Sequence, residues 1–233
     1  MEDKSLWTIE DINILTNLLI CYPYYEQKKN IISMFNNNYL DNRNNFIKKI
    51  IKESLIELQK MYQTNISLGN IDPGSIVLST LNDADYKNLK VYFTKLGNSI
   101  NINYNRDSIL LDARSVYDYN SLVNIKNQIE IIKKKDLYNL GMIFFYLIFS
   151  SLSLEGPNER SAINFIERRI LFCNKNFYKF REMSLQDEWK YILLLLDDNN
   201  MNGWDFFNKL YNSNSTVDNT INELVNHSFL NIN

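Results

Sequence analysis

Apolar side chains recur at steps of three and four residues between residues 43 and 62. This spacing places them on one face of an α-helix, and Asp41, just upstream, has the short polar side chain of an N-cap residue. The recurring apolar positions are Phe46, Ile50, Ile51, Leu55, Leu58 and Met61. The pattern therefore predicts a long amphipathic helix with its apolar face buried.

The most apolar stretch of the chain runs from Leu140 to Leu154 and closely follows Asp136. It is shorter than the roughly 20 residues that span a bilayer, and serines interrupt its end. We therefore expect a central buried helix at about 137–150. Further helices are predicted at 27–35, 114–127, 158–172, 185–196, 202–211 and 217–225.

Two short runs rich in apolar residues, 75–79 and 88–96, are separated by a polar loop. The Pro73-Gly74 turn precedes the first run, and together these features predict a β-hairpin. The predicted fold class is thus mainly α with a small β-hairpin or sheet.

No internal repeat or long linker divides the chain. We expect a single domain over residues 1–233, made of an N-terminal segment at 1–25 and a helical lobe at 26–233. The N-terminal segment includes an expected buried strand at 17–22, ended by Pro23.

Composition narrows the possible function. The chain is 45% hydrophobic, enough for a sizeable core, and its net charge is −2. Proteins that bind nucleic acid usually have a basic surface, and a slightly negative net charge does not indicate one. Its two cysteines and one histidine leave little for a zinc site. No signal peptide or membrane span is expected, so the chain reads as an intracellular, cytoplasmic protein.

Residues 68–75 read Leu-Gly-Asn-Ile-Asp-Pro-Gly-Ser and precede an apolar strand. This segment resembles the catalytic loop of protein kinases, H-R-D-x-K-P-x-N, which also precedes a strand. Residues 136–141 resemble the D-x-x-S-x-G start of the central helix of the kinase C-terminal lobe, and residues 222–230 resemble its closing motif. From about residue 15 to residue 231 the order resembles a kinase hinge and C-terminal lobe.

The resemblance implies that phosphoryl transfer has been lost. Asn70 stands in place of the base, and a neutral amide cannot accept a proton. Asp72 replaces the phosphate-binding lysine, while Ser75 and Lys95 replace the two metal ligands. The six glycines form no Gly-rich nucleotide loop, and too few residues precede the hinge for an N-terminal lobe. We expect no enzyme activity, no cofactor and no metal.

Other positions carry structural expectations. By resemblance, Asp136 accepts backbone N–H groups from the loop at 68–75; a simple N-cap of helix 137–150 is the alternative. Leu68 and Leu96 replace the His and Phe of an internal packing column, although ordinary core leucines would look the same. The remaining structural residues of the resemblance are Gly97, Gly141 and Pro73.

The function that the resemblance implies is that of a degenerate pseudokinase, a scaffold or regulatory subunit. Without an N-terminal lobe, the hairpin face would be open to a protein partner, a second copy, or residues 1–25. The candidate interface residues are Ile76, Val77, Leu78, Val91, Phe93, Tyr22 and Tyr24. Two alternatives remain: an enzyme completed in trans or using an atypical transferase mechanism, and an unrelated helical adaptor.

Overall fold

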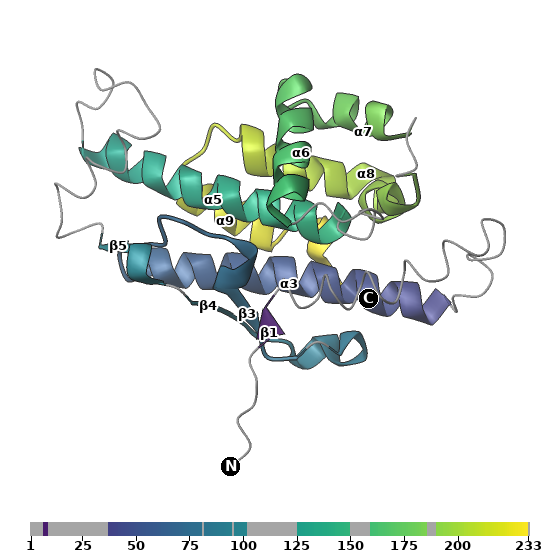
Figure 1. Ribbon diagram of the computed structural model, residues 1–233, viewed down its shortest axis with the longest axis horizontal. Helices are drawn as coiled ribbons and strands as arrows, with labels where there is room; N and C mark the ends of the chain where they lie inside the picture. The colour runs from purple at the N-terminus through teal and green to yellow at the C-terminus, as the bar shows by residue number, and fades with distance from the viewer. Residues whose placement is uncertain are drawn as a thin grey trace, which may run out of the picture.

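The computed structural model is mainly helical, with two small antiparallel sheets (Figure 1), so the predicted fold class is confirmed. Figure 1 shows the sheets on one side of the long helix α3, and α5 to α8 on its other side. The structure describes residues 7–8, 37–80, 82–94, 96–101, 125–149, 159–185 and 190–232. The strand expected at 17–22, the helix expected at 27–35 and most of that expected at 114–127 lie outside these ranges.

Two long helices form the centre of the fold. Helix α3 spans Asn37–Gln63 and begins six residues before the predicted segment. Helix α5 spans Ile125–Phe149, and every residue from 140 to 149 is buried. The prediction of a central buried helix is confirmed, but its predicted start at 137 is wrong, because the helix begins well before Asp136.

The described residues form four further helices: α6 at Glu159–Phe172, α7 at Phe177–Leu185, α8 at Lys190–Asn212 and α9 at Val217–Val225. Helix α9 has the predicted bounds. Helix α8 was expected as two helices, and its two halves are indeed separated by non-helical residues, three of which have positive φ. Helix α7 was not predicted.

The predicted hairpin is present. Strand β3, Ile76–Leu78, pairs antiparallel with β4, Val91–Phe93, so that Leu78 faces Val91 across the ladder. Strand β1, Trp7–Thr8, joins the other edge of β3. A second sheet pairs β2, Ile66–Ser67, with β5, Ile100–Asn101.

Among the described residues, three 3₁₀ helices lie next to the strands and a fourth follows α9. They are η1 at Pro73–Ser75, η2 at Asp83–Asn88, η3 at Leu96–Asn98 and η6 at Ser228–Leu230. Because η2 and η3 occupy both ends of the segment predicted as a strand at 88–96, only its middle pairs with β3.

Aromatic side chains from α5, α7 and α8 form the core of the lobe. The ring of Phe145 stacks on Phe207 with centroids 3.9 Å apart and on Phe177 with centroids 5.6 Å apart. Gly141 lies one turn earlier on α5, where a Cβ would be 2.6 Å from Leu210 Cδ2. Gly141, expected to be structural, therefore allows α5 and α8 to approach closely.

The end of the chain is fixed by His227, which is buried. Its Nδ1 accepts the N–H of Phe229 at 3.2 Å, so the proton must be on Nε2. Nε2 lies 3.0 Å from Asp205 Oδ2 on α8 and donates to it. The closing segment is thereby tied to α8, and His227 has a structural role.

An ion pair joins α7 to α8. Arg181 donates to both carboxylate oxygens of Asp197, at 2.7 and 2.8 Å, and Trp204 Nε1–H donates to the same carboxylate at 2.7 Å. The hydrogen bond from Arg181 lowers the pKa of Asp197 below its ordinary value, assisted by Trp204 and partly opposed by burial. The charged form of Asp197 is thus the one that the fold stabilises.

Within the described ranges, no helix is both long enough and apolar enough to cross a membrane. The longest, α3, has an amphipathic pattern with a buried face and a polar one. Helix α5 is apolar only in its second half, which lies inside the protein.

Substitution Gly203→Ala should destabilise the fold. A Cβ at this position would lie 2.6 Å from Leu196 Cα and 3.0 Å from its carbonyl oxygen, and backbone atoms cannot move aside cheaply. We expect urea denaturation to show a loss of about 1–2 kcal/mol, after the helix-propensity gain of alanine is deducted. Gly97→Ala is the control, because nothing lies within 4 Å of its Cβ. Equal effects of the two changes would refute this packing.

Acidification should break the Arg181–Asp197 contact. Because the folded-state pKa of Asp197 is depressed, its contribution to stability is present above the unfolded pKa and is lost as pH falls through the folded one. The loss should therefore occur below about pH 4. Thermal unfolding between neutral and acidic pH should show a flatter profile for Asp197→Asn than for the wild type. Parallel profiles would contradict the assignment.

Candidate functional site

The loop at 67–75 is held by Asp136, which lies in the interior of α5 and is fully buried. Its Oδ2 accepts the backbone N–H of Leu68 at 2.8 Å and the hydroxyl of Ser67 at 2.6 Å. Its Oδ1 accepts the N–H of Gly69 at 3.0 Å. The expected contact between Asp136 and the loop is present, whereas the N-cap alternative is wrong because the helix begins earlier.

The backbone of this loop requires a glycine at one point. Gly69 has a φ of 72°, in the left-handed region that residues with a Cβ rarely adopt. The two N–H groups that bind the Asp136 carboxylate, those of Leu68 and Gly69, come just before this rotation, which redirects the chain as it leaves the carboxylate. The loop shape is therefore set jointly by Gly69 and Asp136.

Tyr62, near the end of α3, adds a third element to this cluster. Its hydroxyl donates to the carbonyl of Lys133 at 3.1 Å and lies 3.5 Å from Asp136 Oδ2. Burial raises the pKa of Tyr62 well above its ordinary value, and the negative charge of Asp136 raises it further. Tyr62 therefore keeps its proton and remains a donor.

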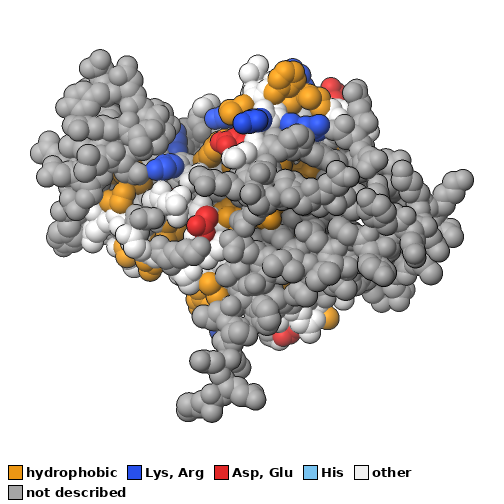
Figure 2. Space-filling model, in the orientation of Figure 1, with side chains coloured by type: hydrophobic (Ala, Val, Ile, Leu, Met, Phe, Trp, Pro, Cys, Tyr) orange, Lys and Arg blue, Asp and Glu red, His pale blue; other side chains and the backbone are white. Residues whose placement is uncertain are grey.

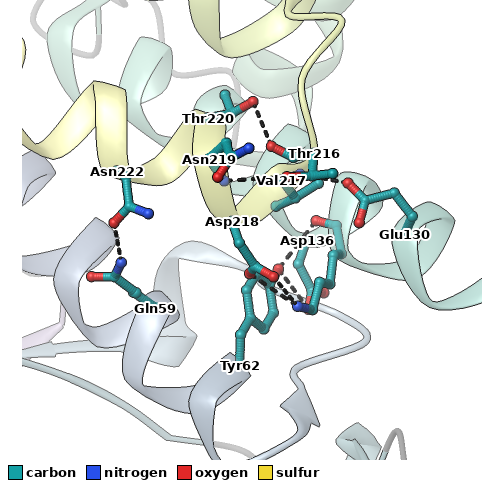
Figure 3. Close-up of polar contacts among 11 residues, drawn as sticks. Gln59, Tyr62, Glu130, Asp136, Thr216, Val217, Asp218, Asn219, Thr220 and Asn222 are labelled. Carbon is teal, nitrogen blue, oxygen red and sulfur yellow. Dashed lines mark hydrogen bonds and ion pairs between the residues drawn. The ribbon is translucent and has the colours of Figure 1, made fainter. Parts of the chain in front are cut away.

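Lys133 connects the cluster to α9. Its Nζ donates to both carboxylate oxygens of Asp218, at 2.9 and 2.8 Å, and lies 4.8 Å above the ring of Tyr62. Figure 3 shows Asp218 on α9 directed toward the space between Tyr62 and Asp136. Nearby, Glu130 accepts the N–H of Val217 at the start of α9. Helices α3, α5 and α9 are thus joined by polar contacts at one point.

Sequence reasoning missed Tyr62 and Lys133. A signal for Lys133 exists, because it precedes Asp136 by three residues and so lies on the same face of a helix. Reading that signal requires knowing that the helix extends upstream of Asp136. Tyr62 carried no signal beyond the apolar periodicity of α3.

Two polar residues of the loop, Asp72 and Ser75, bind each other. The hydroxyl of Ser75 donates to Asp72 Oδ1 at 2.7 Å, and the N–H of Asp72 donates to the Ser75 hydroxyl at 3.2 Å. Ser75 is buried, and Pro73 begins η1 between them, as its fixed φ favours. Asn70 is exposed. The fourth position, Lys95, lies outside the described residues.

Two structural expectations around η3 are wrong. Leu68 is buried as predicted, but Leu96 is 45% exposed and does not belong to an internal column. Leu96 begins η3, whose turn is closed by the Ser99 N–H donating to the Leu96 carbonyl at 2.9 Å. Gly97 is exposed and has open space where a Cβ would stand, so this position does not require glycine.

The hairpin residues expected to form a docking face are largely buried within the chain. Ile76, Leu78 and Val91 are buried in the main core, because alternate strand residues point to the core side of the sheet. Val77 is buried as well, and Phe93 is partly buried against the core. Tyr92 is the large exposed side chain of β4, at 44%. Tyr22 and Tyr24 lie outside the described ranges.

The expectation that the N-terminal segment meets the hairpin can be followed at two residues. Trp7 pairs with Leu78 and Thr8 with Val77, so β1 extends the sheet along the edge of β3. This is edge pairing within the sheet plane, a different arrangement from a cover over one face.

The carboxylates of the cluster around Asp136 bind donors of the protein itself: Asp136 accepts three hydrogen bonds from the loop, and Asp218 is paired with Lys133. In the part of the chain that the structure describes, no group of three or more His, Cys, Asp or Glu side chains is placed to hold a metal ion. The geometry therefore assigns these residues to holding a loop against three helices.

Comparison with known proteins identifies no relative. No protein-family model matches the sequence, and neither a curated protein nor a solved structure shows significant similarity to it. The function must therefore be inferred from the geometry of the chain itself.

Substitution Asp136→Asn should destabilise the fold strongly. In asparagine, an NH₂ group replaces one of the two carboxylate oxygens that accept hydrogen bonds. This NH₂ group would face an N–H or hydroxyl donor of the loop, so that both donors are left buried without an acceptor. We expect a loss of about 2–4 kcal/mol in the free energy of unfolding. Hydrogen exchange at the amides of Leu68 and Gly69 should accelerate most.

The matched control is Glu53→Gln, which removes a carboxylate from an i,i+4 pair with Lys49 at the surface of α3. That change should cost about 0.5 kcal/mol or less. If Asp136→Asn were as mild as this control, or if the amides of Leu68 and Gly69 kept their protection, Asp136 would not be the residue that holds the loop.

Proposed function

We propose that this chain is a non-catalytic, protein-kinase-like C-terminal lobe that acts in the cytoplasm as an interaction or regulatory subunit. The arrangement of a buried aspartate on a central helix, holding a loop that leads into a short hairpin, supports this reading. In the protein kinases that the sequence resembles, the corresponding loop carries the residues that catalyse phosphoryl transfer. The partner that the proposal requires is a protein or a second copy of the chain, not a nucleic acid.

The observation that carries the proposal is the closed pair formed by Asp72 and Ser75. The Ser75 hydroxyl donates to Asp72, so both side chains are engaged within the loop. A carboxylate at the position of a phosphate-binding lysine repels a phosphate, because like charges at short range are unfavourable. Asn70 supplies no base. The loop is thus stabilised by its own side chains without a nucleotide.

A nucleotide titration tests the loss of catalysis. Thermal unfolding should be the same with and without MgATP. By contrast, at about 1 mM ATP a Kd of about 100 µM would add roughly 1.4 kcal/mol and raise Tm by about 3–5 °C. A magnesium-dependent shift of that size, or incorporation of labelled phosphate into the purified chain, would favour an enzyme over a regulatory subunit. An active protein kinase assayed in parallel is the positive control.

A further inference from the structure

The end of α6 presents apolar side chains to solvent. Phe172 is 68% exposed and Leu171 is 51% exposed. They lie off the buried stripe of α6, which Ile166 and Ile170 form at an i,i+4 spacing. Arg168 precedes them by three and four residues and is also exposed, so the three side chains share the outer face of the helix.

The beginning of α7 continues this surface. Phe177 and Phe180 point into the core, while Tyr178, 48% exposed, and Lys179 face outward. Lys179 Nζ lies 5.3 Å from the centroid of the Phe172 ring, so the outer faces of α6 and α7 meet there. We define the α6–α7 patch as Arg168, Leu171, Phe172, Tyr178 and Lys179.

The patch is basic as well as apolar. Figure 2 shows apolar side chains next to Lys and Arg at the top of the molecule, the region of α6 and α7 in Figure 1. The whole chain has a net charge of −2, yet this segment is rich in cations. Between residues 167 and 182 the basic residues are Arg168, Arg169, Lys175, Lys179 and Arg181, and the acidic ones are Glu167 and Glu182.

Some of the charged side chains of this segment bind partners within the protein. Arg181 is paired with Asp197, and Glu167 accepts a hydrogen bond from the Tyr138 hydroxyl at 3.0 Å. Arg168, Lys179 and Glu182 are exposed on α6 and α7. The surface around Leu171 and Phe172 therefore carries a positive balance of outward charge.

We propose that the α6–α7 patch binds an acidic, amphipathic segment of a protein partner. The inference rests on the proposed function and gives it a location, since the hairpin face is buried. Apolar residues of the partner would pack on Leu171 and Phe172, and its carboxylates would meet Arg168 and Lys179. Aromatic and arginine side chains are the residues that most often anchor protein interfaces, and opposite charge selects the partner.

Charge also decides against two other occupants. A second copy using the same patch would place cations against cations across a two-fold axis. A membrane surface would meet two exposed cations and an exposed carboxylate, Glu182, whereas stable anchoring requires a cluster of basic residues or a second anchoring signal. An acidic peptide satisfies both the apolar and the charged parts of the patch.

A peptide selection tests the proposal. A phage-displayed library of random peptides, about 16 residues long, is selected on the full chain, and binders to Phe172→Ser/Lys179→Glu are removed. We expect the retained peptides to combine Asp or Glu with large apolar residues. The affinity of one synthetic peptide, measured by fluorescence anisotropy, should fall about tenfold in Arg168→Glu and weaken at about 0.5 M NaCl.

The control is Tyr92→Ser/Leu96→Ser, which removes two exposed apolar side chains of similar exposure near β4. It should bind the peptide like the wild type. All variants change exposed residues, and their thermal unfolding should match that of the wild type.

Three outcomes would overturn the proposal: no enrichment in the selection, loss of all enriched peptides in the removal step with the Phe172→Ser/Lys179→Glu variant, or retained peptides without an acidic bias. Patch-dependent binding to vesicles of phosphatidylcholine with roughly 30% phosphatidylserine, without peptide binding, would assign the patch to a membrane. Patch-dependent dimers without peptide binding would assign it to a second copy. MgATP binding with intact peptide binding would reject the regulatory function alone and leave this surface in place.

Discussion

The fold depends on the fully buried carboxylate of Asp136. Asp136 can remain in the interior only because N–H and hydroxyl donors of the loop surround it. Those donors come from residues nearly seventy positions away in the chain, so the contact determines where the loop crosses the central helix. Strand β3 follows the loop directly, so the contact also fixes where β3 enters the sheet beside β4, the strand that packs on α3.

Hydrogen bonds and ion pairs are directional, whereas the packing of the apolar core is not, and the fold uses both. Burial of apolar side chains, among them Phe145, Phe177 and Phe207, is the main stabilising contribution, but apolar packing alone would allow several arrangements of the helices. Tyr62 and Lys133 select one of them, because each bonds to a partner on a different helix. Lys133 and Asp218 must meet in space for the pair to form, which determines how α9 packs on α3 and α5.

The parts of the fold that could be predicted are those whose signal is local. The period of α9 and the apolar run of α5 each give a helix, and a motif points to Asp136. Helix α7 is short, and its inward residues Phe177 and Phe180 are too few to establish a period. The α6–α7 patch could not be predicted for a related reason. Residues 170–173 are all apolar, and the sequence does not reveal which two of these side chains face solvent.

The burial of the hairpin residues is physically informative. We expected one face of β3 and β4 to be exposed, because the resemblance lacks an N-terminal lobe that would cover it. Three-residue strands, however, place Ile76, Leu78 and Val91 on the core side, and the edge of β3 is used by β1. In the same region, Asp72 and Ser75 satisfy each other. The loop before β3 is thus closed by its own contacts, and the exposed aromatic and basic residues of α6 and α7 form the surface better suited to a partner.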